Sequence, residues 1–178
     1  MSSLAWSGEL DIPKFVSYRT ALWRILFIEW NLARIDLKVG QEQTYQITYD
    51  GKQGSLRKQV ARIESSNRVW IRETYTFSNS TEIAEYLVEK STGRILDFLI
   101  GGQRQSLPDF KIRITRSKSA TAIDPLSTDQ MKEIEIRANG NNGEVFFAHV
   151  SPRKIPIDGL TRLDIPERIT FELVDYLF

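Results

Sequence analysis

The segment that decides the fold runs from Gln43 to Ile100 and reads QTYQITYDGKQGSLRKQVARIESSNRVWIRETYTFSNSTEIAEYLVEKSTGRILDFLI. Apolar and polar residues alternate along it with a period of two, as in Tyr45, Ile47 and Tyr49, and this period is typical of half-buried β-strands. Short polar connections separate the alternating runs. A parallel return would need a connection of about a dozen residues or more, so neighbouring strands are expected to be antiparallel. The segment therefore predicts a five-stranded antiparallel meander.

The connections within this segment have the chemistry of turns. Asp50-Gly51 fits a tight hairpin turn because glycine tolerates a positive φ. The other connections are polar breaks between strands: Ser65–Asn67, Ser78–Ser80 and Ser91–Gly93. The last strand, Ile95–Ile100, is an almost continuous apolar run, and we expect it to be buried on both faces or nearly so.

The second half of the chain continues the β pattern. Further strands are expected at 110–115, 132–138, 145–150, 161–163 and from 169 onward, with a loop over 120–129 and a hairpin turn over 139–143. We expect the final strand to pair inside the sheet. The predicted fold class is mainly β (α+β), with a strongly curved antiparallel sheet or incomplete β-barrel over about 43–176.

One helix is predicted over about 15–35, because this stretch has neither glycine nor proline and follows Asp11 and Pro13, which suit a helix start. Apolar residues occupy most of its circumference, so it must be covered on most sides. Packing on the concave face of the sheet is the simplest role. A lid over an apolar cavity, a docking surface for a membrane or partner, and strand pairing of part of the segment stay open. A membrane span is disfavoured, since each central charge would cost about 2.5 to 3.5 kcal/mol.

Composition excludes several classes of function but does not identify one. The 178 residues favour one domain over 1–178, and a net charge of +1 gives no pull toward nucleic acid. The chain has no cysteine, which excludes disulfides, thiol chemistry and cysteine-based metal sites. No catalytic motif, metal signature or nucleotide-binding loop occurs, so no cofactor, metal or catalytic residue is expected. His149, the single histidine, is more typical of a structural residue than of a general base.

The order of elements resembles a known group of proteins. The residues that carry the likeness are Leu37–Gly40 before Tyr45–Tyr49, Glu89–Leu96 between two strands, and Ile155–Leu160 before Ile169–Asp175. The sequence resembles bacterial envelope proteins with an incomplete, strongly curved antiparallel barrel, similar to the periplasmic lipoprotein carrier and its outer-membrane receptor. This resemblance implies a periplasmic or cell-envelope location and a concave side that holds an acyl chain or another apolar ligand. The members of that group are exported, whereas Met1–Asp11 has neither a signal-peptide pattern nor a lipobox cysteine.

The first hypothesis is a non-enzymatic binding or carrier protein for a lipid or other apolar ligand, and not an integral membrane protein. The second is a structural or protein-interaction module with a filled core, which uses its sheet edges to form a homodimer or to bind an envelope protein. A small enzyme whose polar groups converge inside a cavity is the third. The apolar lining expected for the first hypothesis comprises Tyr18, Leu22, Trp23, Phe27, Trp30, Tyr75, Phe77, Tyr86 and Phe98.

Overall fold

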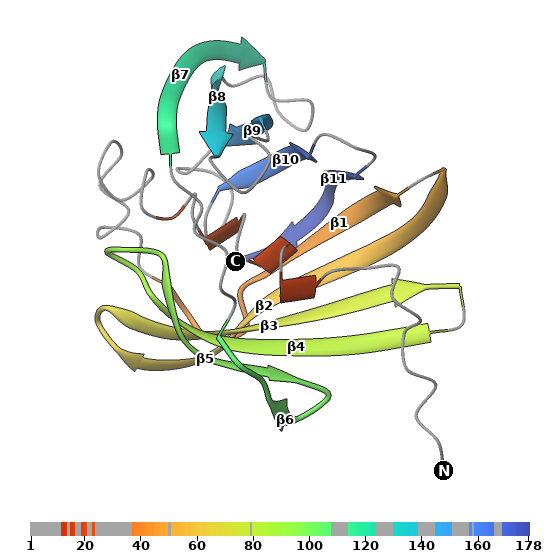
Figure 1. The fold of residues 1–178 in the computed structure, drawn as a ribbon, viewed down its shortest axis with the longest axis vertical. Coiled ribbons are helices and arrows are strands. Elements are labelled where there is room, and N and C mark those ends of the chain that lie inside the picture. Colours follow the sequence, from red (N-terminus) through yellow and green to blue (C-terminus); the bar gives the residue numbers. More distant parts are fainter. Residues whose placement is uncertain are drawn as a thin grey trace.

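An antiparallel sheet of eleven strands makes up most of the described part of the chain (Figure 1). The computed structural model describes residues 12–13, 15–16, 19–20, 23, 37–49, 51–78, 80–107, 114–123, 130–138, 145–150, 157, 159–165 and 169–178. The strands are β1 (Glu42–Tyr49), β2 (Lys52–Ser65), β3 (Arg68–Phe77), β4 (Ser80–Glu89), β5 (Arg94–Ile100), β6 (Gln103–Arg104), β7 (Ile114–Ile123), β8 (Gln130–Ala138), β9 (Val145–Val150), β10 (Leu160–Ile165) and β11 (Ile169–Leu177).

The strand order brings the two halves of the chain together at the middle of the sheet. It runs β6-β5-β4-β3-β2-β1-β11-β10-β9-β8-β7, so the first strand, β1, pairs with the last strand, β11. In this pairing Ile47 of β1 lies opposite Phe171 of β11. The edge strands β6 and β7 are not paired with each other in the described ranges, so the sheet stays open. The predicted mainly β fold class and the antiparallel sheet are therefore confirmed, and in the described ranges the sheet is not closed into a barrel (Figure 1).

The predicted meander is confirmed, since β1 to β5 pair in sequence order. Tyr49 of β1 is paired with Lys52 of β2, and Gly51 between them has a φ of 75°. The last turn of the meander ends at Gly93, with a φ of 68°. Both glycines adopt the positive φ that other residues avoid, which is why the hairpins close at these positions.

Two expectations about the strands were wrong in part. The last strand of the meander is less buried than expected: along β5 Phe98 is buried, Arg94 is exposed and the other residues are half-buried, because the outer neighbour β6 is two residues long and covers little of β5. The loop predicted over 120–129 was wrong at Ala120 to Ile123, which belong to β7 and pair with β8, and residues 124–129 lie outside the described residues. The remaining strands predicted in the second half are present as β8 to β11, and the start of the strand predicted at 110–115 lies outside the described residues.

The N-terminal helix predicted over 15–35 is not established as an element. Helical backbone is present at the described residues 12–13, 15–16, 19–20 and 23, and the rest of the predicted range lies outside the described residues. The described side chains meet the sheet: the rings of Phe15 and Phe171 have centroids 5.7 Å apart. Within the described ranges, no helix has the length and apolarity that a membrane crossing requires.

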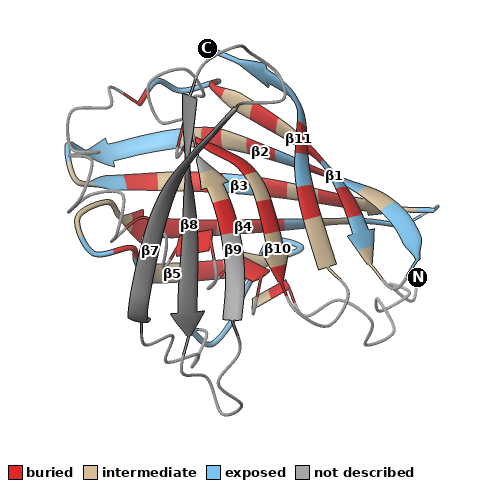
Figure 2. Ribbon diagram, turned by 90° about the horizontal axis from the view of Figure 1, so that it is seen from above, coloured by how far each residue is buried: buried red, intermediate tan, exposed pale blue. Residues whose placement is uncertain are grey.

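The hydrophobic core lies on the concave side of the sheet, and along strands such as β1, β2 and β3 the buried residues that face it alternate with more exposed ones (Figure 2). The hydroxyl of Tyr45 donates a hydrogen bond of 2.8 Å to the carbonyl of Leu160, which ties β1 to β10 across β11. The core consists of Ile12, Phe15, Val16, Trp23, Leu37, Tyr45, Ile47, Leu56, Val60, Val69, Ile71, Tyr75, Ala84, Tyr86, Val88, Phe98, Ala148, Ile157, Leu160, Leu163, Ile165, Phe171 and Leu173.

Gly54→Ala is expected to lower the free energy of unfolding by about 1 to 3 kcal/mol through overpacking. Gly54 lies opposite Phe77, and a Cβ there would be 2.6 Å from both the Phe77 ring and the carbonyl oxygen of Thr76. The ring can move, but the oxygen belongs to the backbone of β3. Urea denaturation measures the change. Ser55→Ala, at the exposed neighbouring position, is the control and should change stability by no more than about 0.5 kcal/mol; equal effects of the two variants would contradict the close packing.

Candidate functional site

A row of three polar side chains crosses the buried face of the sheet. Gln43 of β1 lies opposite Lys58 of β2, and Lys58 lies opposite Glu73 of β3. All three residues have a relative exposure of 0%. The alternation of each strand turns them inward; Lys58, for example, shares its face with the buried Leu56 and Val60. Charged and amide side chains are rarely buried in an apolar surface without partners. This polar row is therefore the part of the concave face where a functional site is most expected.

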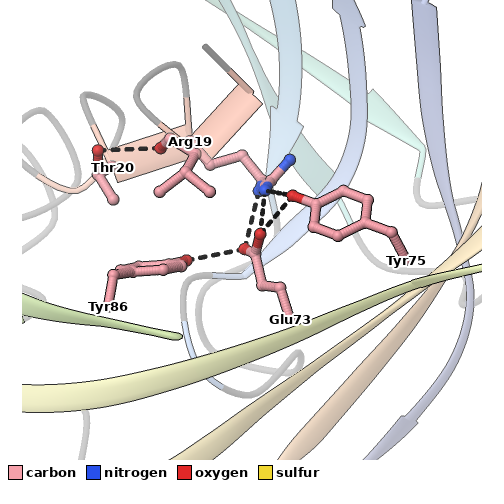
Figure 3. Close-up of polar contacts among 6 residues, drawn as sticks. Arg19, Thr20, Glu73, Tyr75 and Tyr86 are labelled. Atoms are coloured by element: carbon pink, nitrogen blue, oxygen red, sulfur yellow. Dashed lines mark hydrogen bonds and ion pairs between the residues drawn. The ribbon is translucent and has the colours of Figure 1, made fainter. Parts of the chain in front are cut away.

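Glu73 is paired with Arg19 from the N-terminal segment (Figure 3). The Nε of Arg19 donates to Oε1 of Glu73 at 3.1 Å, and its Nη2 donates to Oε2. Both side chains are fully buried. A two-point contact of this kind uses the planar fork of the guanidinium and fixes both groups in orientation as well as in distance.

Two tyrosines complete the hydrogen bonding of the carboxylate (Figure 3). The hydroxyl of Tyr86 donates to Oε1 of Glu73 at 2.8 Å, and the hydroxyl of Tyr75 donates to Oε2. The oxygen of Tyr75 also accepts a hydrogen bond from Nη2 of Arg19. Each carboxylate oxygen therefore accepts one bond from Arg19 and one from a tyrosine, which fills the acceptor capacity of the group.

Arg19 is held between two sides of the curved sheet. Its Cζ lies 5.9 Å from the ring centroid of Tyr75 on β3 and 5.1 Å from that of Phe171 on β11. Three strand spacings, roughly 14 Å in a flat sheet, separate these strands, so the sheet curves around the guanidinium. Burial alone would lower the pKa of Arg19, but the charge of Glu73 and the two tyrosines outweigh burial and raise it. The guanidinium is therefore permanently charged.

The free energy of unfolding should fall as the pH rises above about 10, the ordinary pKa of tyrosine. Burial raises the pKa of both Tyr75 and Tyr86 in the folded chain, and the nearby charge of Glu73 raises the pKa of Tyr86 further. Above that pH the folded chain retains protons that the unfolded chain releases. The contribution of the two tyrosines to the free energy of unfolding is therefore complete below the pKa of the unfolded chain and is lost as the pH rises above it. Urea denaturation between about pH 8 and about pH 11 measures the fall.

The double variant Tyr75→Phe/Tyr86→Phe should show a flatter fall over the same pH range. Tyr176→Phe is the control, because Tyr176 is exposed and lies on β11 away from the carboxylate. A decline as steep in the double variant as in the control would show that these two phenols do not cause it.

Trp23 extends the site toward Lys58. Trp23 is 1% exposed, and the Nζ of Lys58 lies 5.8 Å from its ring centroid, which is within the range of a cation–π contact. Arg19 lies four residues before Trp23 in the sequence, a spacing at which side chains on one helix can interact. The cation contacts of Arg19 are instead with Tyr75 and Phe171 on the sheet.

Several buried polar atoms at the site have no hydrogen-bond partner in the described part of the chain. They are Nη1 of Arg19, Nε1 of Trp23, and both Nε2 and Oε1 of the Gln43 amide. In Figure 3 the Nη1 of Arg19 points away from Glu73. An unpaired buried group costs about 1 to 3 kcal/mol, and folded proteins contain few of them. This stretch of the concave face therefore offers three donors and one acceptor to a further group.

The structure brings together the part of the predicted apolar lining that it describes. Trp23, Tyr75, Tyr86 and Phe98 belong to one buried cluster, and the half-buried Phe77 packs against it. The other predicted lining residues lie outside the described residues: Tyr18, Leu22, Phe27 and Trp30. The His149 position on β9 is half-buried, and its backbone carbonyl accepts a hydrogen bond from Thr161.

Sequence reasoning missed the polar members of the site, namely Arg19 as an ion-pair partner together with Gln43, Lys58 and Glu73. The signal was present in the alternation: each of the three sheet residues lies two positions from apolar residues that face inward, as Glu73 does between Ile71 and Tyr75. Comparisons of the sequence with protein-family models and with curated proteins find no match. The chemistry of the site therefore rests on these residues themselves.

Proposed function

We propose that this chain is a non-enzymatic binding or carrier protein for a lipid or other amphipathic ligand that occupies the concave side of the sheet. The observation that carries the proposal is the set of unpaired donors on Arg19, Trp23 and Gln43, which lie in or beside the polar row and next to the apolar and aromatic core. A ligand with an apolar body and a hydrogen-bond-accepting head, such as a fatty acid, matches both properties.

The unpaired groups favour a ligand over a filled core. A core that serves only for stability gains nothing from Gln43, whose amide is fully buried and unpaired at both atoms. Leucine in that position would remove the desolvation cost without loss of a hydrogen bond. A polar group retained at such cost is typical of a site that binds something polar.

The apolar body of the ligand would pack against the aromatic side chains next to the polar row, including Tyr86 and Phe98. Burial of its surface at roughly 25 cal/mol per Å2 would supply most of the affinity. Since these side chains are fully covered, entry requires the N-terminal segment to move aside. In this proposal the segment is a helical lid packed on the concave face. A periplasmic or cell-envelope location belongs to the same proposal and rests on the sequence resemblance.

Titration with a fluorescent long-chain fatty acid tests this function, with Gln43→Leu as the informative variant. We expect saturable binding to the wild-type chain and binding about tenfold weaker in Gln43→Leu, which corresponds to the loss of one hydrogen bond. The variant should be at least as stable as the wild type, so weaker binding would not reflect unfolding. Trp70→Phe is the matched control: it removes another unpaired Nε1, but from the opposite face of β3. Absence of saturable binding, or equal losses in both variants, would contradict the proposal.

A second candidate is an interaction module that associates with another copy of the chain. Large apolar side chains are exposed toward the end of β11, at Val174, Tyr176, Leu177 and Phe178. Sedimentation equilibrium tests this candidate. A dimer that Leu177→Ser/Phe178→Ser converts to monomer would favour it, whereas a monomeric wild type at all concentrations would count against it.

A further inference from the structure

We propose that the sheet carries a preformed binding site for a guanidinium group, which Arg19 fills from within the same chain and which accepts an alkylguanidine when the Arg19 side chain is absent. We call this site the guanidinium cup; it consists of Glu73, Tyr75, Tyr86 and Phe171. The proposal stands independently of the lipid-binding function, since it concerns the groups that contact Arg19 and not those that are unpaired.

The cup is built from the sheet alone. Glu73 and Tyr75 lie on β3, Tyr86 on β4 and Phe171 on β11, and all four side chains are fully buried. Both tyrosine hydroxyls donate to Glu73 and so hold the carboxylate in place without help from the N-terminal segment. The Arg19 side chain enters an arrangement whose orientation the sheet already determines. Such preorganisation is what allows a site to bind a free ligand.

The geometry selects guanidinium over ammonium. Two parallel donors meet the two oxygens of Glu73, and the Nη2 donor also reaches the hydroxyl of Tyr75. The rings of Tyr75 and Phe171 both lie within 6 Å of the Arg19 Cζ, at 5.9 and 5.1 Å. A planar, weakly hydrated cation can use the fork and the rings together. An ammonium group is compact and strongly hydrated, so it can match only part of this set.

In the wild-type chain Arg19 keeps the cup closed. An intramolecular group acts at an effective concentration of the order of millimolar or more, so it excludes a free ligand present at lower concentration. The cup is therefore available only when Arg19 leaves, and the N-terminal segment acts as its built-in competitor.

Calorimetric titration of the full-length Arg19→Ala variant with propylguanidinium tests the proposal. We expect saturable binding to the variant, no binding to the wild type at the same concentrations, and binding at least about tenfold weaker for propylammonium. The double variant Arg19→Ala/Glu73→Gln should lose the binding, because the carboxylate is gone. Equal binding of the two cations, equal binding to the double variant, or no binding to Arg19→Ala would each overturn the proposal.

Arg19→Ala leaves Glu73 buried without its cation, and this variant can fail to fold. In that case the variant is refolded in the presence of propylguanidinium, with near-ultraviolet circular dichroism as the measure of the folded fraction. Millimolar propylguanidinium should restore the wild-type signal, and propylammonium should not. Failure of propylguanidinium to restore it would overturn the proposal as clearly as an absence of binding would.

Discussion

Glu73→Ala should lower the free energy of unfolding by about 3 to 5 kcal/mol, the cost of leaving a buried charge without its partner. The guanidinium of Arg19 is fully buried and receives its charge compensation from Glu73. Of the contacts that the guanidinium makes with described residues, the variant retains the hydrogen bond of Nη2 to Tyr75 and the two ring contacts. Urea denaturation at neutral pH measures the change; guanidinium chloride is unsuitable because its cation resembles the group under test.

The double variant Arg19→Met/Glu73→Leu is the matched control for this prediction. Replacement of a whole buried ion pair by apolar residues of similar volume is often neutral or stabilising, so the double variant should recover most of the stability that Glu73→Ala loses. A cost for Glu73→Ala below about 1 kcal/mol, the level of a surface ion pair, would mean that the two charges are not buried together in solution.

Trp23→Ala should weaken docking of the N-terminal segment by about 3 to 5 kcal/mol, because a large and almost completely buried indole is lost. If the segment is a lid, this loss releases the segment and leaves the sheet folded. Hydrogen exchange should then accelerate at residues 12–23 while the amides of β3 and β4 keep their protection.

Leu177→Ala is the control for Trp23→Ala, since Leu177 is exposed on β11 and should leave exchange at residues 12–23 unchanged. The opposing result is equally clear. If Trp23→Ala accelerates exchange in β3 and β4 as much as at residues 12–23, the segment and the sheet unfold as one unit. The segment would then be part of the core, and the lid would have to be abandoned.

The regular part of the fold was predictable because it depends on local chemistry. Alternation by two and short turns such as Asp50-Gly51 specify the β1 to β5 meander without reference to the rest of the chain. Two errors arose where the environment of a strand depended on its neighbours. The apolar run of β5 suggested burial on both faces, but β6 is too short to cover it. A loop was predicted from Ala120 onward, although pairing with β8 keeps β7 extended to Ile123.

The site was less predictable because its groups come from distant parts of the sequence. Arg19 and Glu73 are 54 residues apart, and no spacing rule connects a residue in a helical conformation with one on a strand. The alternation did place Gln43, Lys58 and Glu73 on the inward face. Charged residues lie mostly on protein surfaces, so the inward positions of Lys58 and Glu73 were not interpreted as part of a site. A charged residue between two inward apolar residues, as Lys58 and Glu73 are, is therefore a signal for a buried polar site.

The pairing of β1 with β11 also lay beyond sequence reasoning. Both strands alternate, and the final strand was expected to pair inside the sheet, but alternation does not identify the partner. This pairing matters for the site because it brings the ring centroid of Phe171 to 5.1 Å from the Cζ of Arg19. The curvature that encloses the guanidinium is therefore a property of the whole sheet.

Native mass spectrometry of the gently purified chain, with analysis of an organic extract of the same sample, tests the central claim most directly. The proposed function predicts a stoichiometric added mass that the extract identifies as an amphipathic molecule with a hydrogen-bond-accepting head, and a reduced occupancy in Gln43→Leu. A chain that carries no added mass, and takes up neither fatty acid nor phospholipid when challenged with them, would contradict the claim and favour the interaction module.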